Sequence, residues 1–310
     1  MSKRILVTGG AGFIGASLSN RLSERFDVTA VDNLKSGNWG RCNSKVNKLE
    51  LDLASLPYKG YCDLLSDFDD VYHLSAVKLH NQENSLEDIL SNNAVASGRL
   101  FDAAGFMGVK NIFFSSSLYA YGSMGPEPMW ENDLLQPTTY YGASKHFGEL
   151  ALSIAAQKYG FRAITARFFF IYGPNQFSPG GYKSVIVKNF ENATRKKPFE
   201  IVGDGKQSLD YVYIDDCVEI ISRLMNTEFS GVVNIASGKP TSILSIVDEM
   251  QRITNKSDVV YLERDFTHGS TRSGSNAKLQ EIIGSYSFLD IAEGLRRTWK
   301  SIEDLEHHNE

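Results

Sequence analysis

The chain has few cysteines and no segment apolar enough to cross a membrane. Its 310 residues include three cysteines (Cys42, Cys62 and Cys217), an odd number without CxxC spacing, which argues against a disulfide framework and a zinc site. No run approaches the ~20 apolar residues that a membrane span needs. A short apolar run leads directly into Gly9 and Gly10, without the pattern of a signal peptide. We therefore expect a soluble cytoplasmic protein with no membrane partner and no metal.

An excess of positive charge is also missing. The 32 basic residues are outnumbered by 37 acidic ones, which gives a net charge of −5 and argues against nucleic acid as a partner. Hydrophobic residues make up 42% of the chain, enough to bury a sizeable core. A length of 310 residues fits one two-lobed unit better than two independent ones.

The first half of the sequence alternates short apolar runs with helical patterns. Arg4–Thr8 is typical of a buried strand, and the apolar residues of Ile14–Phe26 have helical spacing. Further predicted strands are Val28–Val31, Lys48–Leu51, Val71–Leu74, Asn111–Ser115 and Arg162–Phe169, and further predicted helices are Leu86–Gly105 and Tyr140–Tyr159. Strands that alternate with helices predict an α/β fold, a Rossmann-type doubly wound parallel sheet with helices on both faces.

Glycines follow the first predicted strand at a regular spacing. Gly9, Gly12 and Gly15 match the pattern GxxGxxG between that strand and the next helix. Such glycines permit a tight turn and let the backbone approach a pyrophosphate at the helix N-terminus. Asp32 ends the second strand, where a carboxylate binds the adenosine ribose and repels a 2′-phosphate. The pattern predicts NAD rather than NADP as cofactor; the alternative is an ordinary glycine-rich turn and a strand-end aspartate.

The alternation breaks after about Tyr172, where Gly173 and Pro174 begin a stretch of turn residues. We predict that residues 1–175 form the NAD-binding Rossmann domain and that residues 205–228 return to it. Residues 176–204 and 229–310 are then expected to form a smaller C-terminal α/β lobe that binds the substrate.

Tyr141 and Lys145 lie four residues apart on a predicted helix, so their side chains share one face. A tyrosine with a pKa of about 10 is a poor base at neutral pH, but a neighbouring ammonium group favours its phenolate. By itself such a pair is common on protein surfaces. Ser115–Ser117, however, follows a predicted strand at the carboxyl edge of the sheet, where α/β proteins bind ligands. Together these side chains indicate proton transfer at that edge.

Further segments match one family pattern. They are Gly9–Gly15, Val31–Leu34, Asp52–Leu53, His73–Ala76, Phe114–Gly122, Tyr141–Lys145, Arg167–Gln176 and Gly203–Asp216. With them the chain resembles, over nearly its whole length, the extended short-chain dehydrogenases/reductases, in particular the NAD-dependent nucleotide-sugar epimerase/dehydratase family and its UDP-galactose 4-epimerase branch. The resemblance implies Ser117, Tyr141 and Lys145 as catalytic residues, with Tyr141 as general acid and base and Lys145 as its partner.

The resemblance also implies which residues contact the cofactor and the substrate. For NAD they are Gly9, Gly12, Phe13, Ile14, Gly15, Asp32, Asn33, Asp52, Leu53, Leu74, Ser75, Ala76, Lys78, Asn93, Tyr141, Lys145 and Phe168. For Asn93, an amide that only packs its helix is an equally good interpretation. The implied substrate is a nucleotide-diphosphate sugar, with contacts from Ser117, Phe170, Arg272 and Ser273.

Three departures from the family pattern bear on the reaction and the substrate. Dehydratases and decarboxylases of this kind place a glutamate three residues before the glycine of the Tyr-Gly pair; this chain has Tyr119 there, so elimination lacks its usual acid or base. Phe170 and Leu209 stand where the family usually has an asparagine and an arginine that help to hold the diphosphate. Arg272 remains as a phosphate ligand, although a structural or solvated loop arginine is an alternative.

Ser273 aligns with the position that closes around the C2 side of the sugar. A serine there leaves room for an acetamido group, so we expect N-acetylhexosamine nucleotides to be accepted alongside hexoses. If the local alignment is shifted by one residue, Ser273 is an ordinary loop serine.

The leading hypothesis is a 4-epimerase that oxidises the sugar to a 4-keto form and then returns the hydride. The alternatives are a nucleotide-sugar keto-reductase or dehydrogenase with exchangeable cofactor, and an NAD-binding regulator on the same fold. Similar proteins dimerise through helices equivalent to Leu86–Gly105 and Tyr140–Tyr159, so we expect a homodimer. The alternative is that these helices pack only on the sheet.

Overall fold

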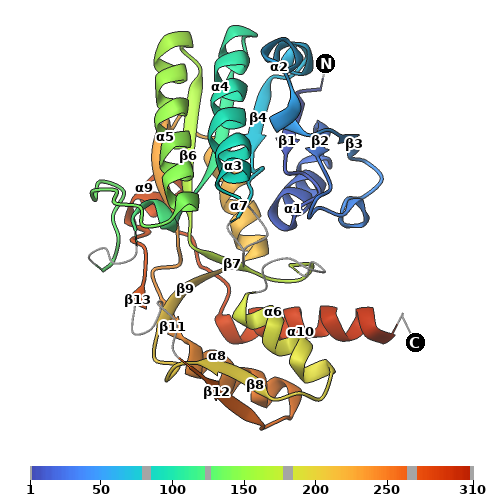
Figure 1. Ribbon diagram of the computed structural model, residues 1–310, viewed down its shortest axis with the longest axis vertical. Helices are drawn as coiled ribbons and strands as arrows, with labels where there is room; N and C mark the ends of the chain where they lie inside the picture. Colours follow the sequence, from blue (N-terminus) through green and yellow to red (C-terminus); the bar gives the residue numbers. More distant parts are fainter. Residues whose placement is uncertain (1, 79–84, 123–126, 177–183, 264–270, 308–310) are drawn as a thin grey trace.

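The protein consists of a large parallel sheet covered by helices, with a smaller lobe beneath it in Figure 1. The computed structural model describes residues 2–78, 85–122, 127–176, 184–263 and 271–307. The strands of the large sheet are β1 (Arg4–Thr8), β2 (Asp27–Asp32), β3 (Asn47–Glu50), β4 (Asp70–His73), β5 (Asn111–Ser117), β6 (Arg162–Phe168) and β10 (Gly231–Ile235). All are parallel and run in the order β10-β6-β5-β4-β1-β2-β3. Because the order reverses between β1 and β4, the predicted doubly wound fold is confirmed.

Helices cover both faces of this sheet. One face carries α1 (Phe13–Leu22) and α7 (Ile214–Met225), and the other carries α2 (Tyr58–Leu65), α4 (Ala96–Phe106) and α5 (Tyr140–Tyr159). Side chains alternate between the faces of a strand. In β1, Ile5 and Val7 join the apolar cluster of α1 and α7, whereas Leu6 joins the cluster of α2, α4 and α5.

The helix predicted over Leu86–Gly105 is divided by a π-helical turn. The segment contains α3 (Leu86–Ile89), the π-helical turn η3 (Leu90–Val95) and α4. Within η3, the buried Asn93 amide hydrogen-bonds to both backbone groups of Val77, at 2.7 Å each. π-helical turns often occur at functional sites, and this one is hydrogen-bonded to the loop after β4.

In the part of the chain that the structure describes, the smaller lobe combines two short sheets with three helices. The first sheet contains β7 (Phe170–Tyr172), β9 (Ser208–Tyr213), β11 (Pro240–Ser242) and β13 (Thr271–Arg272), and the second contains β8 (Phe199–Val202) and β12 (Val259–Leu262). The helices are α6 (Val185–Thr194), α8 (Ile243–Thr254) and α10 (Ile291–His307). The remaining described helices are η1 (Trp39–Arg41), η2 (Leu53–Ser55), η4 (Leu118–Ala120) and α9 (Ala277–Ile283). The C-terminal α10 closes this lobe, and the rings of Phe190 and Trp299 lie 5.3 Å apart.

The boundary between the lobes differs from the predicted division in two places. Residues 229–310 were assigned to the smaller lobe, but β10 pairs with β6 in the large sheet because Val233 and Ile235 bury their side chains there. Residues 205–228 were expected to return to the large sheet, but only α7 does so, while β9 pairs with β7, β11 and β13. None of the described helices is long and apolar enough to cross a membrane.

Candidate active site

The glycine loop after β1 leaves the N-terminus of α1 open to a ligand. Gly9 has φ +67°, and a Cβ there would lie 2.8 Å from the backbone nitrogen of Ser75. A Cβ at Gly15 would lie 2.0 Å from the carbonyl oxygen of Gly9. Gly12 is the N-cap of α1 and supplies no side-chain hydrogen bond to the first turn. The free N–H groups of a ten-residue helix at a close-packed glycine turn fit a pyrophosphate.

Asp32 lies at the end of β2, directly beside the glycine loop. Its carboxylate accepts hydrogen bonds from the backbone nitrogens of Ala11, at 3.0 Å, and Leu34, at 2.9 Å. These bonds fix the carboxylate where the ribose of a dinucleotide lies in this fold. Asn33 follows it and accepts a hydrogen bond from the nitrogen of Lys35 at 3.2 Å. The carboxylate remains able to accept ribose hydroxyl groups, because each oxygen has a further lone pair.

The other predicted adenosine contacts lie after β3. Asp52 caps the short helix η2 and forms an ion pair with Lys35 at 3.2 Å. Leu53 is buried beside it. Lys35, three residues after Asp32 in the sequence, is therefore paired with a carboxylate, which is consistent with a preference for NAD over NADP.

The loop after β4 lies against the glycine loop, since a Cβ at Gly9 would meet the backbone of Ser75. The backbone nitrogen of Ser75 donates to the hydroxyl of Thr8 at 3.3 Å, so Leu74–Ala76 lie against the end of β1. The amide of Asn93 holds this loop and also donates to the hydroxyl of Ser144 on α5 at 3.1 Å. Asn93 therefore joins η3 to this loop and to α5, and its contact with the cofactor stays a prediction. Lys78 lies in the same loop, close enough for its charge to act on Lys145.

His73, the last residue of β4, fixes the start of this loop, a role that was not predicted from the sequence. Its ring lies in hydrogen-bond contact with the hydroxyls of Thr8, at 2.6 Å, and Ser97, at 2.8 Å. The ring also packs against Phe101 and Phe114. Burial, with a smaller effect from the charge of Lys145, lowers the pKa of His73 to about 3. A neutral imidazole thus ties β1, β4 and α4 together.

The three predicted catalytic residues lie together at the carboxyl end of β5. The hydroxyl of Ser117, the last residue of β5, hydrogen-bonds to the phenol of Tyr141. One turn further along α5, the Lys145 ammonium donates to the carbonyl of Ser115 at 2.7 Å and lies 5.8 Å from the centroid of the Tyr141 ring. Phe168 is buried at the end of the neighbouring strand β6.

Burial dominates the protonation of both groups. It raises the pKa of Tyr141, while the hydrogen bond from Ser117 acts in the opposite direction. It lowers the pKa of Lys145 to about 7; the charge of Lys78 lowers it too, and Glu149 raises it. Proton transfer at neutral pH therefore depends on the charges placed around Lys145.

Tyr119 connects the catalytic residues with the smaller lobe. Its ring meets the ring of Tyr141 edge to face, with centroids 5.9 Å apart. The guanidinium carbon of Arg272 lies 5.4 Å from the Tyr119 centroid. Arg272 is only 5% exposed, and its Nε has no hydrogen-bond partner. A buried guanidinium group without a counter-charge among the described residues fits an anionic ligand.

The other predicted substrate residues lie around Arg272. Phe170, in β7, packs its ring 5.9 Å from that of Tyr211. Ser273 is buried, and its carbonyl accepts a hydrogen bond from the nitrogen of Met129 at 2.8 Å. In the register of β13 and β9, Arg272 is paired with Leu209. Arg272 therefore lies beside position 209, where the family pattern usually has an arginine.

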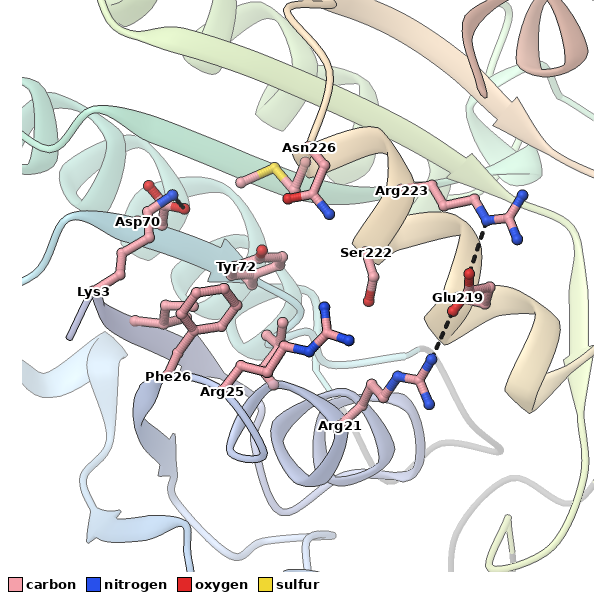
Figure 2. Close-up of a pocket in the computed structure, with 13 residues that line it drawn as sticks. Lys3, Arg21, Arg25, Phe26, Asp70, Tyr72, Glu219, Ser222, Arg223 and Asn226 are labelled. Atoms are coloured by element: carbon pink, nitrogen blue, oxygen red, sulfur yellow. Dashed lines mark hydrogen bonds and ion pairs between the residues drawn. The ribbon is translucent and has the colours of Figure 1, made fainter. Parts of the chain in front are cut away.

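A hollow lies at the amino ends of β1 and β4, between α1 and α7 and away from the predicted site (Figure 2). Glu219 joins Arg21 and Arg223, at 2.8 Å each, and Lys3 pairs with Asp70. These charges largely satisfy one another, and none belongs to the predicted site. The described residues contain no group of three or more His, Cys, Asp or Glu side chains that could hold a metal ion.

Comparisons with known proteins identify the family of the chain. The family model described as "NAD dependent epimerase/dehydratase family" matches residues 5–236. A UDP-N-acetyl-alpha-D-glucosaminuronate decarboxylase from Bacillus cytotoxicus is 28% identical over 99% of this chain and 100% of its own length.

Solved structures of two epimerases have the same fold. The UDP-glucose 4-epimerase of Thermotoga maritima with UDP-glucose has a TM-score of 0.90 and 28% identity, over 98% of this chain and 99% of that one. The UDP-glucuronic acid 4-epimerase of Bacillus cereus, in complex with UDP-glucuronic acid and NAD, has a TM-score of 0.88 and 25% identity, over 97% and 99%. The predicted resemblance is thus confirmed: the chain belongs to the NAD-dependent epimerase/dehydratase family of nucleotide-sugar enzymes.

Proposed function

We propose that the protein is an NAD-dependent nucleotide-sugar 4-epimerase. The observation that carries the proposal is the proximity of Ser117 and Lys145 to Tyr141, together with the packing of the Tyr119 ring, instead of a carboxylate, against Tyr141. A phenol can exchange a proton with a sugar hydroxyl, whereas the carboxylate that usually moves a proton on carbon in this family is replaced here by Tyr119. The arrangement therefore favours oxidation and reduction at one carbon over elimination or decarboxylation.

Each catalytic residue has a distinct task in this proposal. Tyr141 removes the proton of the C4 hydroxyl and later returns it, and Ser117 hydrogen-bonds to the same oxygen. The ammonium group of Lys145 stabilises the phenolate. Bound NAD supplies the reversible hydride acceptor. The 4-keto sugar must then turn its other face before the hydride returns.

We propose the following arrangement of the predicted residues around NAD. Gly9–Gly15 and the open end of α1 would hold the pyrophosphate, and Asp32 would hold the adenosine ribose. Asp52 and Leu53 would border the adenine, while Leu74–Ala76 and Lys145 would line the path to the nicotinamide end.

The proposed reaction is tested on freshly purified protein in two steps. An absorbance spectrum shows whether NAD(H) remains bound, as expected for an epimerase. The protein is then incubated with UDP-, dTDP-, CDP- and GDP-sugars, and the products are separated by chromatography. Interconversion of C4 epimers without net NADH supports the proposal. Net oxidation or reduction would indicate a dehydrogenase or reductase, loss of carbon dioxide a decarboxylase, and cofactor binding without turnover a regulator.

For the substrate, we propose that Arg272 replaces the arginine missing at position 209 and binds the diphosphate. Changing Arg272→Leu removes a charge-assisted contact and should raise KM by roughly 10- to 100-fold. Adding Leu209→Arg to this variant should recover part of the loss, because the two residues are paired in neighbouring strands. Steady-state kinetics on the accepted nucleotide sugar measure both effects.

Arg252 provides the matched control for this experiment. It lies on α8, is largely exposed and pairs with Glu249, so Arg252→Leu should leave KM unchanged. An unchanged KM in Arg272→Leu would reject Arg272 as a diphosphate ligand. For Ser273 we keep the proposal that it leaves room for an acetamido group, so both hexose and N-acetylhexosamine nucleotides should be accepted.

We also expect a homodimer. Side chains of Phe147, Leu150 and Ile154 are exposed along one stripe of α5, and Leu90 and Val95 are exposed in η3. Figure 1 shows α3, α4 and α5 side by side on the outer face of the large sheet. An exposed apolar stripe of this kind is typical of an interface between subunits. Light scattering at micromolar concentration should give twice the chain mass, and a monomer would contradict the expectation.

A further inference from the structure

A third residue of α5 is buried beneath the catalytic pair. Glu149 lies one turn after Lys145, and its side chain is 7% exposed. Its carboxylate receives two hydrogen bonds from Arg167 of β6, at 3.0 and 2.8 Å, and one from the hydroxyl of Ser116. A carboxylate buried with its counter-charge and three donors has a single orientation.

Glu149 and Lys145 also fasten α5 to β5, the strand that carries Ser117. Ser116 of β5 holds Glu149 through its hydroxyl, and the preceding residue, Ser115, holds Lys145 through its carbonyl. Ser115 and Ser116, neighbours in β5, thus hydrogen-bond to successive turns of α5. A shift of α5 along β5 would break both contacts, so the position of the Lys145 ammonium depends on the position of Glu149.

Arg167 extends the same network toward the smaller lobe. Its guanidinium group donates to the carbonyl of Glu131 at 3.0 Å. The carboxylate of Glu131 accepts from the nitrogen of Asn234, and the Asn234 amide donates to the carbonyls of Met129 and Ser275. The segment after Arg272 is therefore joined to the catalytic helix through buried hydrogen bonds.

Glu149 also sets the charge around Lys145. The charged or titratable groups that face Lys145 are Tyr141 and Glu149 on α5, His73 on β4 and Lys78 in the loop after β4. His73 is neutral near pH 7, and Lys78 disfavours the ammonium form of Lys145. Among the described residues, Glu149 is the group whose charge favours that form.

We propose that Glu149 is a positioning residue of this enzyme, which holds Lys145 at β5 and keeps it an ammonium ion beside Tyr141. The proposal rests on the proposed function for its meaning in catalysis, but not for its test. Without the negative charge, Lys145 loses its proton at lower pH. The phenolate of Tyr141 then lacks its cation at neutral pH, and turnover falls.

The test compares two variants that break the same ion pair from opposite sides. Glu149→Gln removes the negative charge and keeps a side chain of the same shape, whereas Arg167→Met removes the positive charge. The titration of Lys145 is followed by NMR of protein with carbon-labelled lysine, purified with its cofactor; the Lys145 signal is identified by its loss in Lys145→Met. We expect the titration midpoint to fall by about one pH unit in Glu149→Gln and not to fall in Arg167→Met.

A merely structural role predicts a different result. Both variants would then be destabilised to a similar extent, with the midpoint of Lys145 unchanged in both or lowered equally; either result would overturn the proposal. If Glu149→Gln does not fold, the double variant with Glu149→Leu and Arg167→Met leaves no buried unpaired charge and should show the same lowered midpoint.

Turnover is measured separately in the same variants. If the wild-type protein epimerises a sugar, the alkaline decline of kcat should begin at a lower pH in Glu149→Gln than in the wild type, with little change in KM. If the wild-type protein turns over no nucleotide sugar, the proposed function fails, while the NMR titration still decides the role of Glu149.

Discussion

Replacing Tyr141 by phenylalanine is expected to lower kcat by ~10²–10⁴ while leaving NAD bound. The change removes only the hydroxyl that contacts Ser117, and the ring that packs against Tyr119 remains. Proton transfer to and from the sugar then lacks its acceptor, whereas the glycine loop and Asp32 are untouched. Turnover assays and the absorbance of the purified protein, which reports bound cofactor, measure the two expectations together.

Tyr140 is the matched control, since it is the preceding residue of the same helix. Its side chain points to solvent and is 57% exposed. Tyr140→Phe should therefore retain wild-type turnover and cofactor content. Activity of Tyr141→Phe within a few-fold of the wild type would remove Tyr141 from the mechanism, and loss of NAD from that variant would show that the phenol also helps to hold the cofactor.

Elements with local end signals could be predicted from the sequence with correct bounds. The helix α5 begins where the hydroxyl of Thr139 accepts from the nitrogen of Gly142, and it ends at Gly160, which has φ +79°. Both signals are readable in the sequence. The position of β10 has no such local signal in the sequence, because Val233 and Ile235 could pack in either lobe. Its place beside β6 depends on a partner more than sixty residues away.

The distinction between local signals and distant partners also applies to the candidate site. The strand-end rule and the helical spacing bring Ser115–Ser117, Tyr141 and Lys145 to one edge of the sheet, and the family resemblance singles out Ser117 among the three serines. Glu149 and Arg167 were missed because a charged residue in a helix or strand is usually solvated. Their pairing is a tertiary event: it becomes visible only when β6 and α5 bury both side chains. A buried arginine in an otherwise apolar predicted strand was the available signal.

Changing Gly15→Ala is expected to abolish retention of NAD. The added methyl group would lie 2.0 Å from the carbonyl oxygen of Gly9 and 3.0 Å from the Cα of Gly10. Both are backbone atoms, so the loop can relieve the clash only by opening. An opened loop no longer presents the N–H groups of α1 to the pyrophosphate. We expect NAD affinity to fall by roughly 100-fold or more, and the free energy of unfolding by about 1–3 kcal/mol.

Gly98, in α4, separates this steric effect from the general effect of adding a methyl group to a helix. A Cβ at Gly98 meets only the ring of Phe147, at the ordinary distance of 3.7 Å. Gly98→Ala should therefore keep NAD and gain up to about 1 kcal/mol, because alanine favours the helix. Isothermal titration with NAD and chemical denaturation distinguish the two variants. If Gly15→Ala bound NAD as tightly as Gly98→Ala, the close approach of α1 to Gly9 would not be needed for the cofactor, and the pyrophosphate would have to lie elsewhere.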